Sequence, residues 1–403
     1  MARLAQRVRD LAPSETLALS AKANELRAAG HPVINFSVGE PDFVSPKAAM
    51  DAGRASIDRG ETHYPPVPGT PELRQAIVDK VAETTGQRYD AGAVLVSNGA
   101  KHTLYNLIQT LVDPGDEVAY ASPYWVSYPA MVQLAGGRPV PIPTRASDGF
   151  RLDPAAVEAA LGPRVKVLIL NSPCNPTGAV AAPEDVDAVV RLALDKGVLV
   201  ISDEIYGSLV FGGVTHRSAV SVEHPGVREG VILVDGVSKG YAMTGWRIGY
   251  CVGPVDVIKA AGKIQGQSTS GACAVAQAAA AGALRHGDPE AATMREAFGK
   301  RRTTMLDALR AIPGVTVPEA QGAFYAFPDV SSYYGAELGG RTIGGSLDLS
   351  NLLLEEAHVA CVPGGAFGAD AHLRLSYALP EEEIREGVGR IAKVLSQAKL
   401  QNS

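Results

Sequence analysis

Residues 231–250 read VILVDGVSKGYAMTGWRIGY and combine a strand pattern with two cations. The apolar run 231–234 predicts a buried strand, and Lys239 and Arg247 follow its end. A lysine amine attacks carbonyl groups only when burial or a nearby cation lowers its pKa. A guanidinium can hold a phosphate through two parallel hydrogen bonds. The stretch therefore predicts a Schiff-base lysine beside an anion site, although composition alone favours a surface lysine and a structural arginine.

Two further apolar runs end in polar residues. The run 165–170 is followed by a turn in which two prolines flank Asn175, and the run 198–201 is followed by Asp203 and Tyr206. Ligands bind at the carboxyl ends of the strands in open α/β sheets, so we expect these side chains to face one crevice. Taken separately, Asn-Pro is a common turn signal and Asp203 is more often a helix cap.

Residues 94–101 read VLVSNGAK and predict a strand, a turn of small residues and the start of a helix. We expect the N–H groups of Gly99, Ala100 and Lys101 to be unpaired and to point outward, where the helix dipole adds favourable charge for a phosphate. One glycine in such a turn is weak evidence by itself. Elsewhere the pattern predicts a strand over 33–38, helices over 183–196, 274–284 and 289–311, and a final helix after residue 380.

Taken together, these residues resemble the fold-type I pyridoxal-phosphate enzymes, and specifically the bacterial aspartate/prephenate branch of the class I aspartate aminotransferase family. The resemblance covers the whole chain, from VGEPDF at 38–43 and YPP at 64–66 through PYWVSYP at 123–129 to LRLSYA at 373–378. It implies an α/β fold with a mostly parallel sheet in a large domain and a smaller α/β domain built from both chain ends. The expected boundaries are 1–45 for the arm and part of the small domain, 46–287 for the cofactor domain and 288–403 for the rest.

The resemblance also implies a role for each residue around pyridoxal 5'-phosphate. Lys239 would form the internal aldimine and then move a proton as general base and acid, with Asp203 and Tyr206 as the other catalytic residues. Asp203 would contact the pyridine nitrogen, and Asn175 and Tyr206 the phenolic oxygen, while Trp125 would stack on the ring. The phosphate would be held by Gly99, Ala100, Lys101, Arg247 and the partner subunit's Tyr64, because the active sites of the implied homodimer lie at its interface.

Substrate roles follow from the same resemblance. Arg374 would bind the α-carboxylate, with Gly39, Trp125 and Asn175 nearby, and Ser14, Thr16 and Lys101 would receive a distal carboxylate. The implied reaction is ping-pong transamination between L-aspartate and 2-oxoglutarate. Prephenate, an aromatic or another amino acid is the alternative, since residues 268–273 and Gly240 depart from the family pattern.

Two other classes of function compete with this interpretation. Residues 236–240 read GVSKG, a literal G-x-S-x-G, so Ser238 could serve a hydrolase with Asp348 or Asp370 and His372. Against it, residues 244–250 predict a turn and another strand where a hydrolase requires a helix. A catalytically inactive amino-acid-binding protein on the same fold is the third possibility.

Composition is that of a globular protein with two unequal domains. The 403 residues are 46% hydrophobic and carry a formal net charge of −6, which gives no basic field for nucleic acid. The first residues lack a signal-peptide core and no segment is apolar enough for a membrane span, so we expect a cytoplasmic protein. Four scattered cysteines and the absence of an H-E-x-x-H pattern predict neither a disulfide framework nor a metal site.

Overall fold

The computed structural model describes residues 4–11 and 15–398. Its centre is a sheet of seven strands in the order β2-β8-β7-β6-β5-β3-β4, in which β8 runs antiparallel to both of its neighbours and the other pairs are parallel. The strands are β2 Val94–Ser97, β3 Glu117–Ser122, β4 Arg138–Pro143, β5 Val165–Asn171, β6 Leu199–Asp203, β7 Val231–Gly236 and β8 Gly249–Val252.

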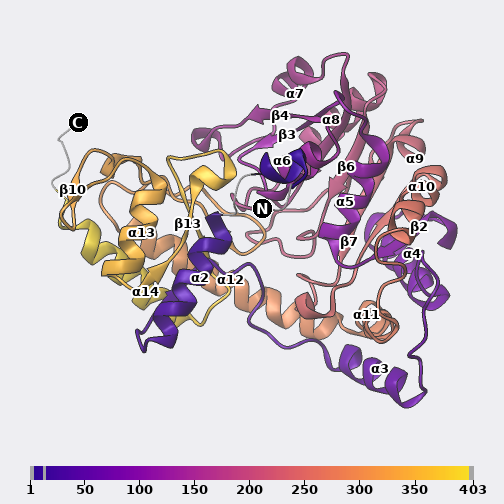
Figure 1. Ribbon diagram of the computed structural model, residues 1–403, viewed down its shortest axis with the longest axis horizontal. Helices are drawn as coiled ribbons and strands as arrows, with labels where there is room; N and C mark the ends of the chain where they lie inside the picture. The colour runs from indigo at the N-terminus through magenta and orange to yellow at the C-terminus, as the bar shows by residue number, and fades with distance from the viewer. Residues whose placement is uncertain (1–3, 12–14, 399–403) are drawn as a thin grey trace.

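Helices cover the large sheet and form most of the remaining structure (Figure 1). Prolines at the first turn of α4, α7, α8 and α12 suit positions that need no backbone donor. The helices are α1 Gln6–Arg9, α2 Glu15–Ala28, α3 Lys47–Asp58, α4 Pro71–Thr85, α5 Ala100–Leu111, α6 Ser127–Leu134, α7 Pro154–Ala160, α8 Pro183–Asp195, α9 Val227–Gly230, α10 Val255–Gly266, α11 Ala274–His286, α12 Asp288–Arg310, α13 Ser346–Glu356 and α14 Glu381–Leu395.

The register of the parallel strands places the carboxyl ends of β5, β6 and β7 side by side. Asn171 of β5 pairs with Asp203 of β6, and Asp203 pairs with Val234 of β7. The apolar parts of these strands are buried on both faces, as expected for strands covered by helices on each side. Side chains that follow the three strands therefore meet at one edge of the sheet.

A second body of small sheets and helices contains residues from both ends of the chain. The strand β1 (Ile34–Asn35) pairs in parallel with β12 (Val359–Ala360), and β13 (Val362–Pro363), β14 (Leu373–Ser376) and β9 (Tyr325–Ala326) form a second sheet. The hairpin of β10 (Glu337–Leu338) and β11 (Arg341–Thr342) completes it. Figure 1 shows α2, α13 and α14 on this side of the molecule, with α12 running toward the large sheet. The α/β fold with a smaller part from both chain ends is confirmed, while the boundaries at 45 and 287 stay predictions.

The element predictions hold with one correction. The helices expected over 183–196, 274–284 and 289–311 are α8, α11 and α12, and a turn followed by β8 stands after Lys239. The strand expected over 33–38 is wrong in length, because β1 ends at Asn35. The Asn35 side chain accepts hydrogen bonds from the backbone N–H and the hydroxyl of Ser37, which turns the chain out of the strand. No helix in the described part of the chain is long and apolar enough to cross a membrane.

Candidate active site

A cavity of about 980 Å³ lies at the carboxyl ends of β5, β6 and β7. It brings together most of the residues that the sequence singled out. Those that line it are Gly39, Ala100, Lys101, Trp125, Asn175, Asp203, Tyr206, Lys239, Arg247 and Arg374.

Lys239 follows β7 and reaches across the cavity. Its Nζ donates to the carbonyl of Gly39 at 2.6 Å, so the two segments 200 residues apart in sequence are in contact. Burial lowers the pKa of Lys239 to about 8; Glu40 opposes this shift, and Arg247, Arg374 and Lys101 reinforce it. A useful fraction of the amine is therefore neutral near physiological pH.

Asp203 is a buried carboxylate at the end of β6, 4% exposed. The Tyr128 hydroxyl donates to its Oδ2 at 2.6 Å and the Ile205 N–H to its Oδ1 at 3.4 Å. Burial raises the pKa of Asp203 to about 6, against the hydrogen bond from Tyr128. Residues 205–208 form a turn, so the alternative in which Asp203 caps an α-helix is wrong.

Arg374 of β14 is the buried cation on the opposite side of the cavity. Its Nη1 donates to Asn175 Oδ1 at 3.1 Å and its Nη2 to the Ser37 carbonyl at 2.9 Å. The guanidinium carbon lies 4.5 Å from the centre of the Tyr325 ring and 5.1 Å from that of Phe367. The Nε of Arg374 is buried without a hydrogen-bond partner among the residues that the structure describes. A buried donor left without a partner indicates a site for an anionic acceptor.

Tyr206 and Tyr325 join the two sides of the cavity. Their hydroxyls lie 2.9 Å apart, and both side chains are buried. Burial raises the pKa of Tyr206 well above its ordinary value, so the phenol remains a neutral donor.

The helix α5 begins beside Arg247. Gly99 precedes it with no side-chain cap and with φ +83°, a backbone conformation that favours glycine, and a Cβ there would lie 2.6 Å from Arg247 Nη2 and force the guanidinium to move. Arg247 itself has φ +56° and donates to the Thr244 carbonyl at 2.7 Å. The N–H of Gly99 donates to the Ser97 carbonyl at 2.8 Å, so the expectation that this group is unpaired is wrong.

The next two N–H groups, those of Ala100 and Lys101, have no acceptor in residues 4–11 and 15–398, as predicted. The Lys101 ammonium lies 5.0 Å from the centre of the Trp125 ring. An ammonium at this distance from an indole is within the range of a cation–π contact.

The structure does not place three further predicted residues in this constellation. Tyr64 is 95% exposed and does not line the cavity of its own chain, which is compatible with the predicted contact to a partner but does not test it. Ser14 lies outside the described residues. Thr16 belongs to α2, and its side chain lies outside the described part of the structure.

The chain matches the family model "Aminotransferase class I and II" over residues 31–391. It belongs to this family. The aspartate aminotransferase of Streptomyces avermitilis is 46% identical over 98% of this chain and 97% of its own length. The aspartate/prephenate aminotransferase of Cereibacter sphaeroides is 44% identical over 97% of this chain and 98% of its own. A solved structure, the aspartate aminotransferase from Thermus thermophilus with maleate, superposes with a TM-score of 0.91 at 41% identity, covering 98% of this chain and all of that one.

The protein is thus an aminotransferase, and aminotransferases of this family depend on pyridoxal phosphate. The structure also removes the serine-hydrolase alternative. Ser238 lines the cavity, but the His372 ring stacks on Phe327 at 4.7 Å, and neither ring nitrogen has a partner within the described residues. The carboxylate of Asp370 accepts from Ser346 instead. No Ser-His-Asp chain is assembled from the described residues.

Sequence reasoning missed two side chains of this aminotransferase cavity. Tyr128 of α6 holds Asp203, and Tyr325 of β9 contacts both Tyr206 and Arg374. Tyr128 lies in the stretch 123–129 that carries the family resemblance, whereas Tyr325 lies in none of the stretches quoted for it, and neither residue's surroundings in the sequence contain a signal for these contacts. The pairs Tyr128–Asp203, Tyr325–Tyr206 and Tyr325–Arg374 form only because α6 and β9 pack against the ends of the strands.

Proposed function

We propose that this aminotransferase transfers the amino group of L-aspartate to 2-oxoglutarate by a ping-pong mechanism that depends on Lys239. The observation that carries the proposal is one cavity in which a lysine with a pKa of about 8 lies between a buried carboxylate and a buried arginine with a free donor.

The residues present fit pyridoxal phosphate. Asp203 is a buried carboxylate suited to a protonated ring nitrogen, and the neutral Tyr206 and the amide of Asn175 suit the phenolic oxygen. The free N–H groups of Ala100 and Lys101 together with Arg247 suit the phosphate. Trp125 offers a flat face for the ring. When bound, the cofactor withdraws electrons from the substrate Cα and so acidifies its proton.

Lys239 then acts as the proton carrier. Its amine takes the proton from the substrate Cα and later returns one, and a pKa of about 8 suits both directions near neutral pH. The Gly39 carbonyl, which accepts from Nζ at 2.6 Å, holds the amine in the cavity when it is not bonded to the cofactor. Arg374 binds the α-carboxylate, because its buried Nε and its fork need an anion.

The choice of an acidic substrate rests on Lys101 and on the relatives. The Lys101 ammonium lies over the Trp125 ring in the first turn of α5. At this end of a helix the dipole disfavours a cation unless an anion is near. Ser14 and Thr16 are proposed to share the distal carboxylate. Relatives are named for aspartate, and one solved relative holds maleate, a dicarboxylate. Prephenate is a second acceptor candidate, since one relative is named for both.

Three broader features belong to the same proposal. We infer a homodimer in which the partner's Tyr64 completes the phosphate site, and the exposure of this side chain supports a contact outside its own chain. We also infer a cytoplasmic enzyme and the domain limits 1–45, 46–287 and 288–403. Cross-linking with mass spectrometry of the purified protein tests the dimer, and limited proteolysis tests the domain limits.

Borohydride reduction of the cofactor-loaded protein, followed by peptide mapping, tests the central claim. The pyridoxyl group should be found on Lys239, and a label on another lysine would contradict the proposal. A screen of amino donors with 2-oxoglutarate tests the substrate, with aspartate expected to give the highest kcat/KM.

A further inference from the structure

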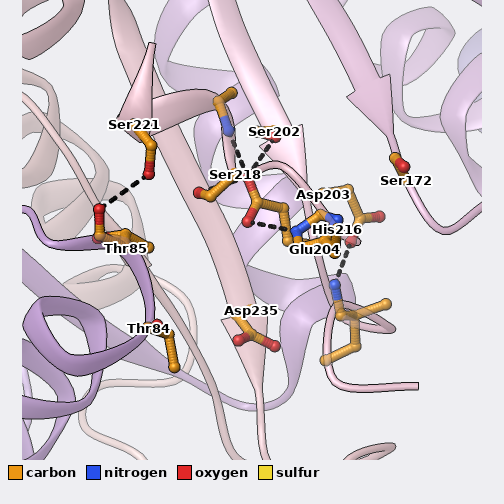
Figure 2. Close-up of polar contacts among 12 residues, drawn as sticks. Thr84, Thr85, Ser172, Ser202, Asp203, Glu204, His216, Ser218, Ser221 and Asp235 are labelled. Atoms are coloured by element: carbon orange, nitrogen blue, oxygen red, sulfur yellow. Dashed lines mark hydrogen bonds and ion pairs between the residues drawn. The ribbon is translucent and has the colours of Figure 1, made fainter. Parts of the chain in front are cut away.

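A buried polar cluster surrounds Glu204, the residue that follows Asp203 (Figure 2). Asp203 and Glu204 are consecutive at the end of the strand, so their side chains point to opposite faces of the sheet. Glu204 is 5% exposed and does not line the cavity. The cofactor site as described above gives this second carboxylate no role.

Four donors converge on the Glu204 side chain. Its Oε1 accepts from the hydroxyls of Ser202 at 2.7 Å and Ser218 at 3.0 Å and from the Ala219 N–H at 3.0 Å, while its Oε2 lies 3.0 Å from His216 Nε2. A carboxylate has about four acceptor sites in all, and here three of the contacts share Oε1 while His216 alone faces Oε2. The Glu204 backbone also donates to the Val234 carbonyl and accepts from Gly207, so the cluster fixes the turn that carries Asp203 and Tyr206.

His216 is the only cation of this cluster in the described part of the chain, and it depends on Glu204. The other ring nitrogen, Nδ1, is buried and has no hydrogen-bond partner in the described residues, so Glu204 alone orients the ring. Burial lowers the pKa of His216, but the hydrogen bond and charge of Glu204, with a smaller effect of Asp235, outweigh it and leave this pKa raised. Glu204 and His216 therefore form a buried hydrogen-bonded pair that is an ion pair whenever the imidazole is protonated.

The charges around Asp203 show why this pair matters. The titratable groups that act on it are Tyr128 of α6, which donates to its Oδ2, Glu204, the next residue, whose side chain lies on the other face of the sheet, and Lys239 after β7; Asp235 of the neighbouring β7 completes the set. Burial raises the pKa of Asp235 to about 7, and the Glu204 charge adds to this rise. Asp203 must stay ionised to hold a cationic ring nitrogen, yet an uncompensated neighbouring carboxylate pushes a proton onto it.

We propose that Glu204 and His216 are a positioning pair for Asp203: the histidine cation neutralises Glu204, so that Asp203 keeps the negative charge that faces the cofactor ring. This inference rests on the proposed role of Asp203. It predicts opposite effects for two conservative substitutions, which a merely structural role would not produce.

The test measures the affinity of full-length protein for pyridoxamine 5'-phosphate by equilibrium dialysis between pH 5 and 8. This aminated probe has no aldehyde for Lys239, and its own titration is the same for every variant and cancels in the comparison. Affinity of the wild type should fall as the pH drops through about 6, where Asp203 takes up a proton.

His216→Gln should shift this fall upward by about one pH unit, with roughly fivefold weaker binding at pH 6, because Glu204 is left uncompensated. Glu204→Gln should shift it downward. The double variant should behave like Glu204→Gln, since His216 acts only through Glu204. His224→Gln is the matched control: it breaks another histidine–carboxylate pair, His224 with Asp195 at 3.1 Å, and should leave the fall in place.

Shifts of Glu204→Gln and His216→Gln in the same direction, or no shift in either, would overturn the inference. If Glu204→Gln fails to fold by circular dichroism, the comparison of His216→Gln with His224→Gln decides alone. Asp203→Asn separates this result from the proposed function. If the fall near pH 6 is as large in that variant as in the wild type, the role of Asp203 itself is wrong. If it becomes smaller in Asp203→Asn but is unchanged by the substitutions at Glu204 and His216, only the inference is rejected.

Discussion

The cavity has two walls of different origin. One wall consists of the ends of neighbouring parallel strands, which present Asp203 and, just beyond β7, Lys239. The other consists of segments far apart in sequence, where Arg374 contacts Ser37 and Tyr325. The first wall holds the groups whose pKa values are shifted toward neutrality, and the second holds a buried cation with a free donor. The difference suggests that the strand-end wall carries the chemistry and the cross-chain wall carries recognition.

Removing the lysine should have the largest effect. Lys239→Ala eliminates both the nucleophile and the proton carrier, so transamination should fall by at least about 10⁴-fold. Steady-state kinetics with aspartate measures this, and an unchanged circular dichroism spectrum would show that the fold survives. If the variant keeps even a hundredth of the wild-type rate, Lys239 is not the residue that carries the reaction, and the chemistry does not reside on the strand-end wall.

Asp203→Asn should be next. The amide can still accept from Tyr128 but cannot hold a cationic ring nitrogen, so kcat should fall by about 10²–10³-fold while cofactor remains bound. Absorbance of the bound cofactor and kcat are measured on the same sample. Tyr128→Phe is the milder control, since it removes one hydrogen bond to Asp203 and should lower kcat less. Near-normal turnover in Asp203→Asn would show that this carboxylate is not part of the chemistry.

The same contrast explains how much of the molecule could be predicted from sequence. Strands place their following residues at one edge, so the meeting of Asn175, Asp203 and Lys239 follows from local patterns and topology. The contacts of Tyr128, Tyr325 and His216 depend on how a helix, a short strand and a loop pack against that edge. No local period encodes such packing. The early end of β1 has a different, local cause: the Asn35 side chain competes with the sheet for the backbone N–H of Ser37.

Arg374→Gln tests the recognition wall. It should lower kcat/KM for every amino donor by about 2–5 kcal/mol, mainly through KM, because the α-carboxylate is common to all substrates. Cofactor affinity should be unchanged. Arg374→Lys keeps the charge but not the fork and should recover only part of the loss. If only kcat falls, Arg374 takes part in the chemistry, and the distinction between a wall for chemistry and a wall for substrate recognition is wrong.

The pH dependence of cofactor capture sharpens the account of the first wall. A pKa of about 8 for Lys239 means that the neutral amine increases about tenfold per pH unit up to pH 8 and then levels off. The rate at which cofactor-free protein captures pyridoxal phosphate should follow this curve above pH 6.5, where Asp203 is largely ionised. Stopped-flow absorbance measures it. A rate still climbing tenfold per unit above pH 9 would mean that burial does not lower the pKa of this lysine.

The smallest effect on kcat/KM is expected from a substitution of Lys101, which is proposed to contact the side chain of the substrate. Lys101 is exposed, lies 5.0 Å from the Trp125 ring and stands at the start of α5, where the dipole mildly opposes its charge. A distal carboxylate would offset that opposition, so Lys101→Ser should lower kcat/KM for aspartate by about 1–3 kcal/mol and spare alanine and aromatic donors. Lys259→Ser, which removes another exposed lysine from the neighbouring helix α10, should change neither. An equal loss with every donor would assign Lys101 to the phosphate rather than to the substrate. A wild type that prefers aromatic donors would refute the acidic substrate while leaving transamination intact, because the groups that carry the chemistry lie on the other wall.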